Sequence, residues 1–160
     1  MSSDAQTEIR REIRVRIDKR HPSEPLVRAF ILERADLMAL SVVEGADRTR
    51  DRFLRRFASS LLEERSARQR FPYSQEPGTV ADRLYFAITE DMRREIDSVS
   101  LLEQFGDGSL EDPMFYSIRP KPDGWRVPVG SVITHEGAIE LYVTSGELES
   151  LLESPFFAHY

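Results

Sequence analysis

The spacing of apolar residues changes partway along this 160-residue chain, and the change constrains the fold more than any other feature. Up to about residue 102, apolar residues recur mostly at steps of three and four, which is the repeat of an amphipathic helix. After residue 113 they alternate with polar residues in short runs separated by Gly, Pro and Asp, as in antiparallel strands joined by turns. The sequence therefore predicts an α+β chain in which most of the helices precede the sheet.

Three helices are predicted within residues 23–104. A Ser-Glu-Pro start and a glycine stop favour a first helix over 23–44, and an aspartate cap favours a second over 47–70. The two helices would form an antiparallel αα-hairpin. Apolar residues at helical steps, which follow a Thr and an Asp placed as in a capping box, predict a third helix over 79–102.

A three-strand antiparallel meander is predicted within residues 113–144. Its strands would span 114–119, 125–134 and 138–144, with Gly137 in a left-handed conformation in the second turn. Three prolines in or beside these strands cannot donate ladder hydrogen bonds, so we expect sheet edges or bulges there: Pro120, Pro122 and Pro128.

Each end of the chain adds one further element. The β-branched run IRVRI favours a strand from about residue 11, which would join the meander as a fourth strand, although isoleucines at four-residue steps also suit a helix. Thr144 and Glu147 form a capping box that opens a short final helix over 145–154.

We expect a single domain over residues 1–160, with residues 1–7 disordered, because this length with 40% hydrophobic residues can bury a core. The chain has no cysteine, which excludes disulfides and Cys-ligated metals.

The N-terminus lacks an apolar leader, and the most apolar run, 26–43, carries four charged residues. These features predict a cytoplasmic protein without a membrane partner. Twenty arginines against two lysines indicate a GC-rich prokaryotic genome.

Charge is unevenly distributed along this acidic chain, whose net charge is −6. Residues 1–70 hold 16 basic and 12 acidic residues, a balance of +4, whereas residues 71–160 hold 6 and 16, a balance of −10. The acidic half could meet a basic partner, or it could meet the arginines of the first half within the fold.

The stretch DRTRDRFLRRF, residues 47–57, holds five arginines. On a helix, its apolar residues would begin a stripe that faces the core: Phe53, Leu54, Phe57, Ala58, Leu61 and Leu62. Four arginines would form a ridge on the other faces, and we take this ridge as the candidate binding surface: Arg48, Arg52, Arg55 and Arg56. Interrupting acids and the lack of an interleaved aromatic residue disfavour nucleic acid as its partner. The ridge would then be either a solvated helix face with internal ion pairs or a contact surface for protein, including the acidic half of this chain.

No pattern of a catalytic or metal site is complete. The three histidines lie far apart, and THEGA lacks the second histidine of the zinc-protease motif. Asp123 and Glu140 are placed as in a metal-dependent nuclease pattern, but Tyr142 stands where that chemistry needs a lysine. We therefore predict no catalytic residue, no bound metal and no cofactor.

The C-terminal tail PFFAHY holds three aromatic residues. They would either fold back onto the core or mark a dimer or partner interface: Phe156, Phe157 and Tyr160.

Three functional hypotheses follow. The first is a small, non-catalytic protein that binds another protein, as an inhibitor, immunity or adaptor factor. The second is a nucleic-acid-associated regulator that uses the Arg48–Arg56 ridge. The third is an enzyme whose site lies on the meander face and uses Tyr116, Glu140 and Tyr142.

Overall fold

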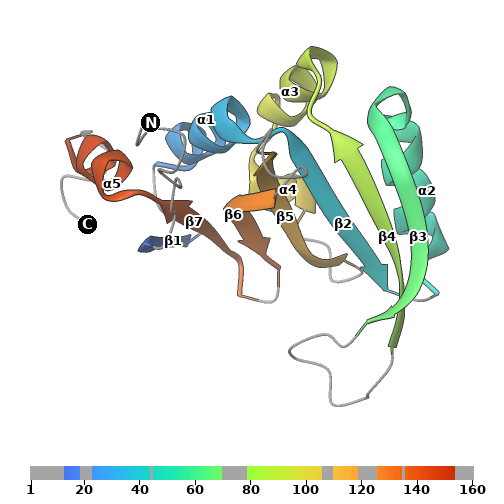
Figure 1. Cartoon of the computed structure of the whole chain (residues 1–160). Coiled ribbons are helices and arrows are strands. Elements are labelled where there is room, and N and C mark those ends of the chain that lie inside the picture. Colours follow the sequence, from blue (N-terminus) through green and yellow to red (C-terminus); the bar gives the residue numbers. More distant parts are fainter. Residues whose placement is uncertain are drawn as a thin grey trace, which may run out of the picture.

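The computed structural model describes residues 13–18, 23–43, 45–69, 79–105, 110–118, 126–134 and 136–153. Within these ranges the chain forms one seven-stranded antiparallel sheet of order β1-β7-β6-β5-β2-β4-β3 (Figure 1). The strands are β1 (Ile13–Asp18), β2 (Leu37–Val43), β3 (Leu61–Gln69), β4 (Thr79–Ala87), β5 (Leu110–Ile118), β6 (Arg126–Ile133) and β7 (Ala138–Val143). The α+β class is confirmed, but the sheet is larger than the three or four strands expected.

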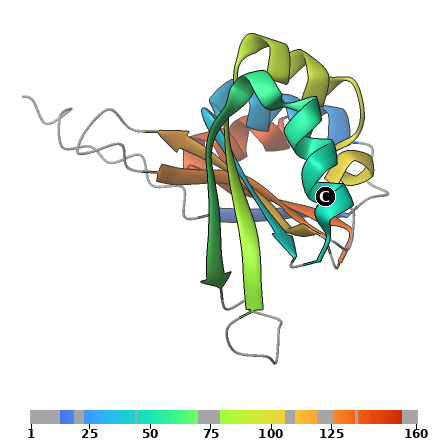
Figure 2. The same cartoon turned by 90° about the vertical axis from the view of Figure 1, so that its right-hand side faces the viewer.

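Five helices in the described ranges lie on one side of this sheet, as Figure 2 shows. They are α1 (Glu24–Arg34), α2 (Asp47–Arg56), α3 (Glu90–Asp97), α4 (Leu101–Phe105) and α5 (Ser145–Leu152), and a short 3-10 turn, η2 (Ala58–Ser60), follows α2. The main apolar core fills the space between the helices and the sheet. No helix in the described ranges lies on the other side, which we call the open sheet face.

The predicted helix over 23–44 is wrong in its second half, because residues 37–43 form strand β2. β2 lies inside the sheet, paired with β4 on one side and β5 on the other, and its first six residues are buried. A strand buried on both faces is apolar at every position, so its sequence carries no two-residue alternation to distinguish it from a core helix.

The predicted helix over 47–70 ends early, because α2 stops at Arg56 and β3 begins at Leu61. Residues 61–69 have good helix formers, but pairing with β4 along the whole length of β3 overrides this preference. Since β2 separates α1 from α2, the predicted αα-hairpin is also wrong.

The predicted helix over 79–102 is replaced by β4, α3 and α4. A step of four residues fits one helical turn, but it also fits two repeats of a strand. Leu84 and Phe86, one strand repeat apart, face the core from β4. The helix cap lies ten residues later than expected, at Thr89, whose side chain accepts a hydrogen bond from the amide of Met92. The expected helical part over 23–104 therefore contains three strands.

Several predictions for the rest of the chain are confirmed. The meander is formed by β5, β6 and β7, and β1 joins it by pairing with β7. A bulge in the β5–β6 pairing lies beside Pro128, and Gly137 has a φ of 60°. The Thr144 and Glu147 capping box starts α5. Residues 1–7, the three histidines, Pro120, Pro122 and the aromatic tail Phe156, Phe157 and Tyr160 lie outside the described residues.

Gly130 of β6 allows α1 to pack closely on the sheet. A Cβ atom at this position would lie 2.8 Å from Cδ1 of Ile31 and 3.3 Å from the carbonyl oxygen of Glu140. Gly130→Ala should therefore lower the free energy of unfolding by about 1–3 kcal/mol, which urea denaturation would measure. Gly146→Ala is the matched control, because a Cβ there meets nothing within 4 Å. Equal stability of the two variants would contradict this packing.

Candidate functional surfaces

The predicted arginine ridge lies on α2, but its four arginines are not equally exposed. Arg48, Arg52 and Arg55 are exposed on the outer part of the helix. Arg56 is less exposed and donates from Nε to Oε1 of Glu95 at 3.0 Å and from NH2 to Oε1 of Gln104 at 2.7 Å. Arg56 therefore ties α2 to α3 and α4, and three arginines of the ridge remain on the surface.

Ion pairs connect the basic first half of the chain with its acidic second half. The two halves meet because β1 lies beside β7, α1 lies beside α3 and α5, and α2 lies beside α3. Five such pairs occur in the described ranges: Arg14–Glu140, Arg16–Glu136, Arg28–Asp97, Arg34–Glu147 and Arg56–Glu95. Part of the charge asymmetry of the sequence is thus neutralised within the fold.

Two neighbouring arginines of α2 should differ in their contribution to stability. Arg56→Ala removes the link to Glu95 and Gln104 and should lower the free energy of unfolding by about 1–2 kcal/mol. Arg55 is exposed and its Nε contacts only the nearby carbonyl oxygen of Asp51 at 3.4 Å among the contacts that the structure describes, so Arg55→Ala should change stability by less than about 0.5 kcal/mol. Urea denaturation measures both values, and the reverse order would show that Arg56 is not a structural link.

A hollow lies next to the ridge, and two exposed leucines follow it in the chain. The hollow is on the outer side of α2, lined by Asp51, Leu54, Arg55 and Ala58. Leu61 and Leu62, which follow η2, are 36% and 61% exposed. They begin β3, the last strand of the sheet, which pairs with β4 alone among the described strands. We call these residues the α2–β3 surface: Asp51, Leu54, Arg55, Ala58, Leu61 and Leu62. The sequence placed both leucines in a buried helical stripe and so missed this surface.

The three residues predicted for an enzyme site do lie on one face. Residues next to them in the strands, Phe115 and Leu141, enter the core, so Tyr116, Glu140 and Tyr142 lie on the open sheet face. The carboxylate of Glu140 lies near the hydroxyl of Tyr142 and acts on its titration. Three pockets in the described part of the chain are lined by residues of the helices and of η2, and these three do not lie on this face.

The titration of the two tyrosines indicates hydrogen-bond donors, not bases. Burial raises the pKa of Tyr142 to about 12, and the nearby Glu140 carboxylate adds to the effect. Burial also raises the pKa of Tyr116, although Arg83 and Arg126 oppose the increase. A general base at neutral pH needs a pKa near the working pH, so both phenols stay protonated.

The raised pKa of Tyr142 predicts a loss of stability at high pH. An unfolded tyrosine ionises near pH 10, whereas folded Tyr142 holds its proton to about 12. The contribution of this group is therefore complete below pH 10 and is lost as the pH rises through about 12. Tyr142→Phe should lose less stability than the parent across this interval in urea denaturation. Its phenolate absorbance titration should also lack the highest transition, and an unchanged titration would contradict the assignment.

Sequence reasoning missed the arginines that surround these tyrosines. Arg83 of β4 donates from Nε to Oγ of Ser41 at 3.2 Å and from NH1 to the hydroxyl of Tyr85 at 3.4 Å. The guanidinium of Arg126 on β6 lies 4.8 Å from the centre of the Tyr85 ring. Because residues 79–102 were expected to be helical, nothing in the sequence indicated that Arg83 and Tyr85 would lie near Tyr116.

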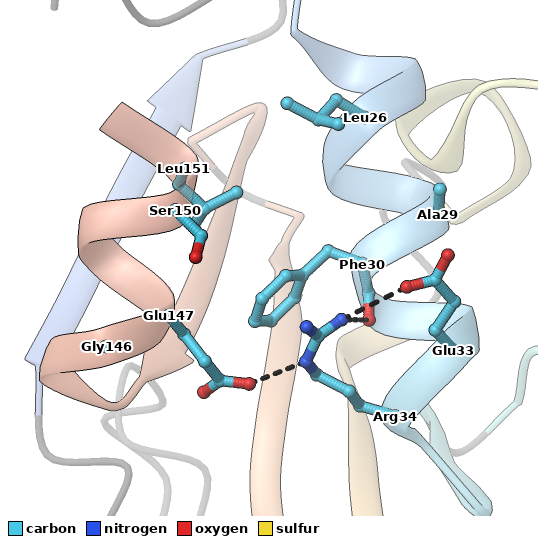
Figure 3. Close-up of a pocket in the computed structure, with 9 residues that line it drawn as sticks. All are labelled: Leu26, Ala29, Phe30, Glu33, Arg34, Gly146, Glu147, Ser150 and Leu151. Carbon is cyan, nitrogen blue, oxygen red and sulfur yellow. Dashed lines mark hydrogen bonds and ion pairs between the residues drawn. The ribbon is translucent and has the colours of Figure 1, made fainter. Parts of the chain in front are cut away.

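A pocket of about 320 Å³ lies between α1 and α5 (Figure 3). Its apolar lining includes Leu26, Phe30 and Leu151, and Arg34 and Glu147 point toward each other across it. Arg34 donates from Nε to Oε2 of Glu147 at 2.6 Å and stacks 3.7 Å from the centre of the Phe30 ring. The other carboxylate oxygen of Glu147 accepts the Thr144 amide of the capping box at 3.0 Å. These polar groups are used to join the two helices.

The described residues contain no cluster of three or more His, Asp or Glu side chains that could hold a metal ion. Within the same residues, no helix has the length and apolar character needed to cross a membrane. Comparison with known proteins found no matching family model, no matching curated protein and no matching solved structure.

Proposed function

We propose that this chain acts by binding another protein, without catalysing a reaction, through the α2–β3 surface. The observation that carries the proposal is the pair of consecutive exposed leucines, Leu61 and Leu62, which begin β3 shortly after the residues that line the hollow on α2. Neighbouring exposed apolar residues favour a protein interface more than single ones, which are common on any surface. Val99, Ile118 and Leu152, the other large exposed apolar residues in the described ranges, are far from this pair in sequence.

Charge and backbone geometry indicate the kind of partner. Leu54 and Ala58 offer an apolar floor, while Arg48, Asp51 and Arg55 supply a polar rim, the arrangement of a protein interface. The outer edge of β3 is not paired with another described strand, so an extended segment of the partner could add to it through backbone hydrogen bonds. The partner segment would carry an apolar side chain for the hollow and acidic residues for the arginines.

The two alternatives have less support. For the enzyme, the protonated state of Tyr116 and Tyr142 disfavours a role as base, and Glu140 is already paired with Arg14 at 3.8 Å. For the nucleic-acid regulator, the use of Arg56 within the fold leaves a shorter ridge. A protein contact of the inhibitor, immunity or adaptor type needs neither a base nor a continuous ridge.

Leu62→Asp should weaken partner binding, and Leu152→Asp should not. Leu152 is a matched control because it is 49% exposed but lies on α5. We expect affinity capture from the native host to recover one stoichiometric protein with the parent chain and with Leu152→Asp. Calorimetry with the two purified proteins should then show binding at least about tenfold weaker for Leu62→Asp, as expected for an apolar residue at the centre of an interface.

Two results would contradict the proposal. One is a partner whose affinity is the same for Leu62→Asp and the parent chain. The other is turnover of a phosphoester or acyl substrate by the purified protein that is abolished by replacing a single carboxylate or serine.

A further inference from the structure

Two arginines on the open sheet face have no carboxylate among their described contacts. In the described ranges, Arg14, Arg16, Arg28, Arg34, Arg50, Arg56 and Arg94 all contact a carboxylate. Arg83 instead contacts the hydroxyls of Ser41 and Tyr85, and Arg126 lies over the Tyr85 ring. No carboxylate is among the contacts of Arg83 or Arg126 that the structure describes. Among the described contacts, these two guanidinium groups, on β4 and β6, are therefore not paired with an acid.

Tyrosine rings lie across the same face on every second strand. Tyr142 is on β7, Tyr116 on β5 and Tyr85 on β4, and the sheet order places β6 and β2 between them. Neighbouring strands are about 4.8 Å apart, so the tyrosine-bearing strands are roughly 10 Å apart. Tyr85 is buried beneath Arg126, whereas Tyr116 and Tyr142 are partly exposed. The face therefore carries both aromatic rings and cations.

We propose that the open sheet face binds single-stranded nucleic acid, with bases stacked on Tyr116 and Tyr142 and phosphates bound by Arg83 and Arg126. Each element of this ligand matches a feature of the face. Aromatic side chains stack on bases of any sequence, and arginines neutralise phosphates. A duplex keeps its bases stacked and paired inside, so the rings select a single strand.

The remaining charges on the face are compatible with an anionic ligand. Glu140, two residues from Tyr142, is paired with Arg14. The strand pairing also places Glu63 opposite Tyr85 on this face. Further out, Arg16 is paired with Glu136. Because the whole chain carries a net charge of −6, we expect affinity in the micromolar range that falls steeply as salt is raised.

This binding site is separate from the α2–β3 surface. The helices, α2 included, lie on the other side of the sheet, so a protein partner and a nucleic acid could bind at the same time (Figure 2). The two proposals can therefore be tested separately. Leu62→Asp should not change nucleic-acid binding, and the sheet-face variants should not change partner binding.

Fluorescence anisotropy with labelled oligothymidylate and oligouridylate of about 20 nucleotides tests the site on the full chain. In about 50 mM salt we expect both to bind the parent protein, with the affinity falling as salt is raised and with duplex DNA binding more weakly. Arg83→Gln with Arg126→Gln should reduce affinity at least about tenfold. Tyr116→Leu and Tyr142→Leu should each reduce it about five- to a hundredfold, whereas Tyr116→Phe and Tyr142→Phe should retain it because the ring remains.

The matched control is Arg48→Gln with Arg55→Gln, which removes the same charge from α2 and should leave the affinity unchanged. Circular dichroism and urea denaturation check that every variant is folded. If the leucine variants do not fold, the double arginine variant and the phenylalanine variants decide the question.

The proposal is wrong if neither oligonucleotide binds, or if the α2 control loses as much affinity as Arg83→Gln with Arg126→Gln. It is also wrong if polyglutamate or an abasic oligonucleotide binds as tightly, because then charge alone would account for binding.

Discussion

The pairing of β2 on both of its edges is the constraint on which the rest of the fold depends. β2 connects the β3–β4 hairpin to the strands of the meander, and its odd-numbered and even-numbered residues are buried on opposite faces of the sheet. Met38, Leu40 and Val42 join the main core under the helices, while Leu37 and Ala39 form a small cluster with Tyr85 on the open face. A chain that failed to bury this strand would separate into two unconnected pieces of sheet, each with a new exposed edge.

The chain path that follows from this pairing also decides how the charge is distributed. Several elements of the basic first half lie beside elements of the acidic second half, so arginines of β1, α1 and α2 meet acids of β7, α3 and α5. Each of these partly exposed ion pairs adds little to the stability of the fold. Together they neutralise part of the net charge of each half. The arginines that stay on the surface or contact only neutral groups are then the ones that a partner or ligand can use.

The two functional proposals use different physical properties of the fold. At the end of the sheet, exposed leucines and an unpaired strand edge offer apolar area and backbone hydrogen bonds, which suit a protein segment. On the open face, rings and guanidinium groups are spread across several strands, which suits a flexible polyanion with aromatic bases. Neither surface needs a deep pocket, and the pocket between α1 and α5 has its polar groups engaged in joining those helices.

The sequence by itself determined the features that depend on neighbouring residues: the fold class, the meander, the β1 strand, the capping box of α5 and the helix that carries Arg48 to Arg56. It could not determine the central strand β2 or the β3–β4 hairpin, because apolar runs and four-residue steps fit helices and strands equally well. The pairing of strands in the folded sheet decided between helix and strand for these segments. It exposed Leu61 and Leu62, withdrew Arg56 from the surface and brought Arg83, Tyr85, Tyr116 and Arg126 together from three strands. Contacts between residues so distant along the chain leave no local pattern, and only the folded sheet creates them.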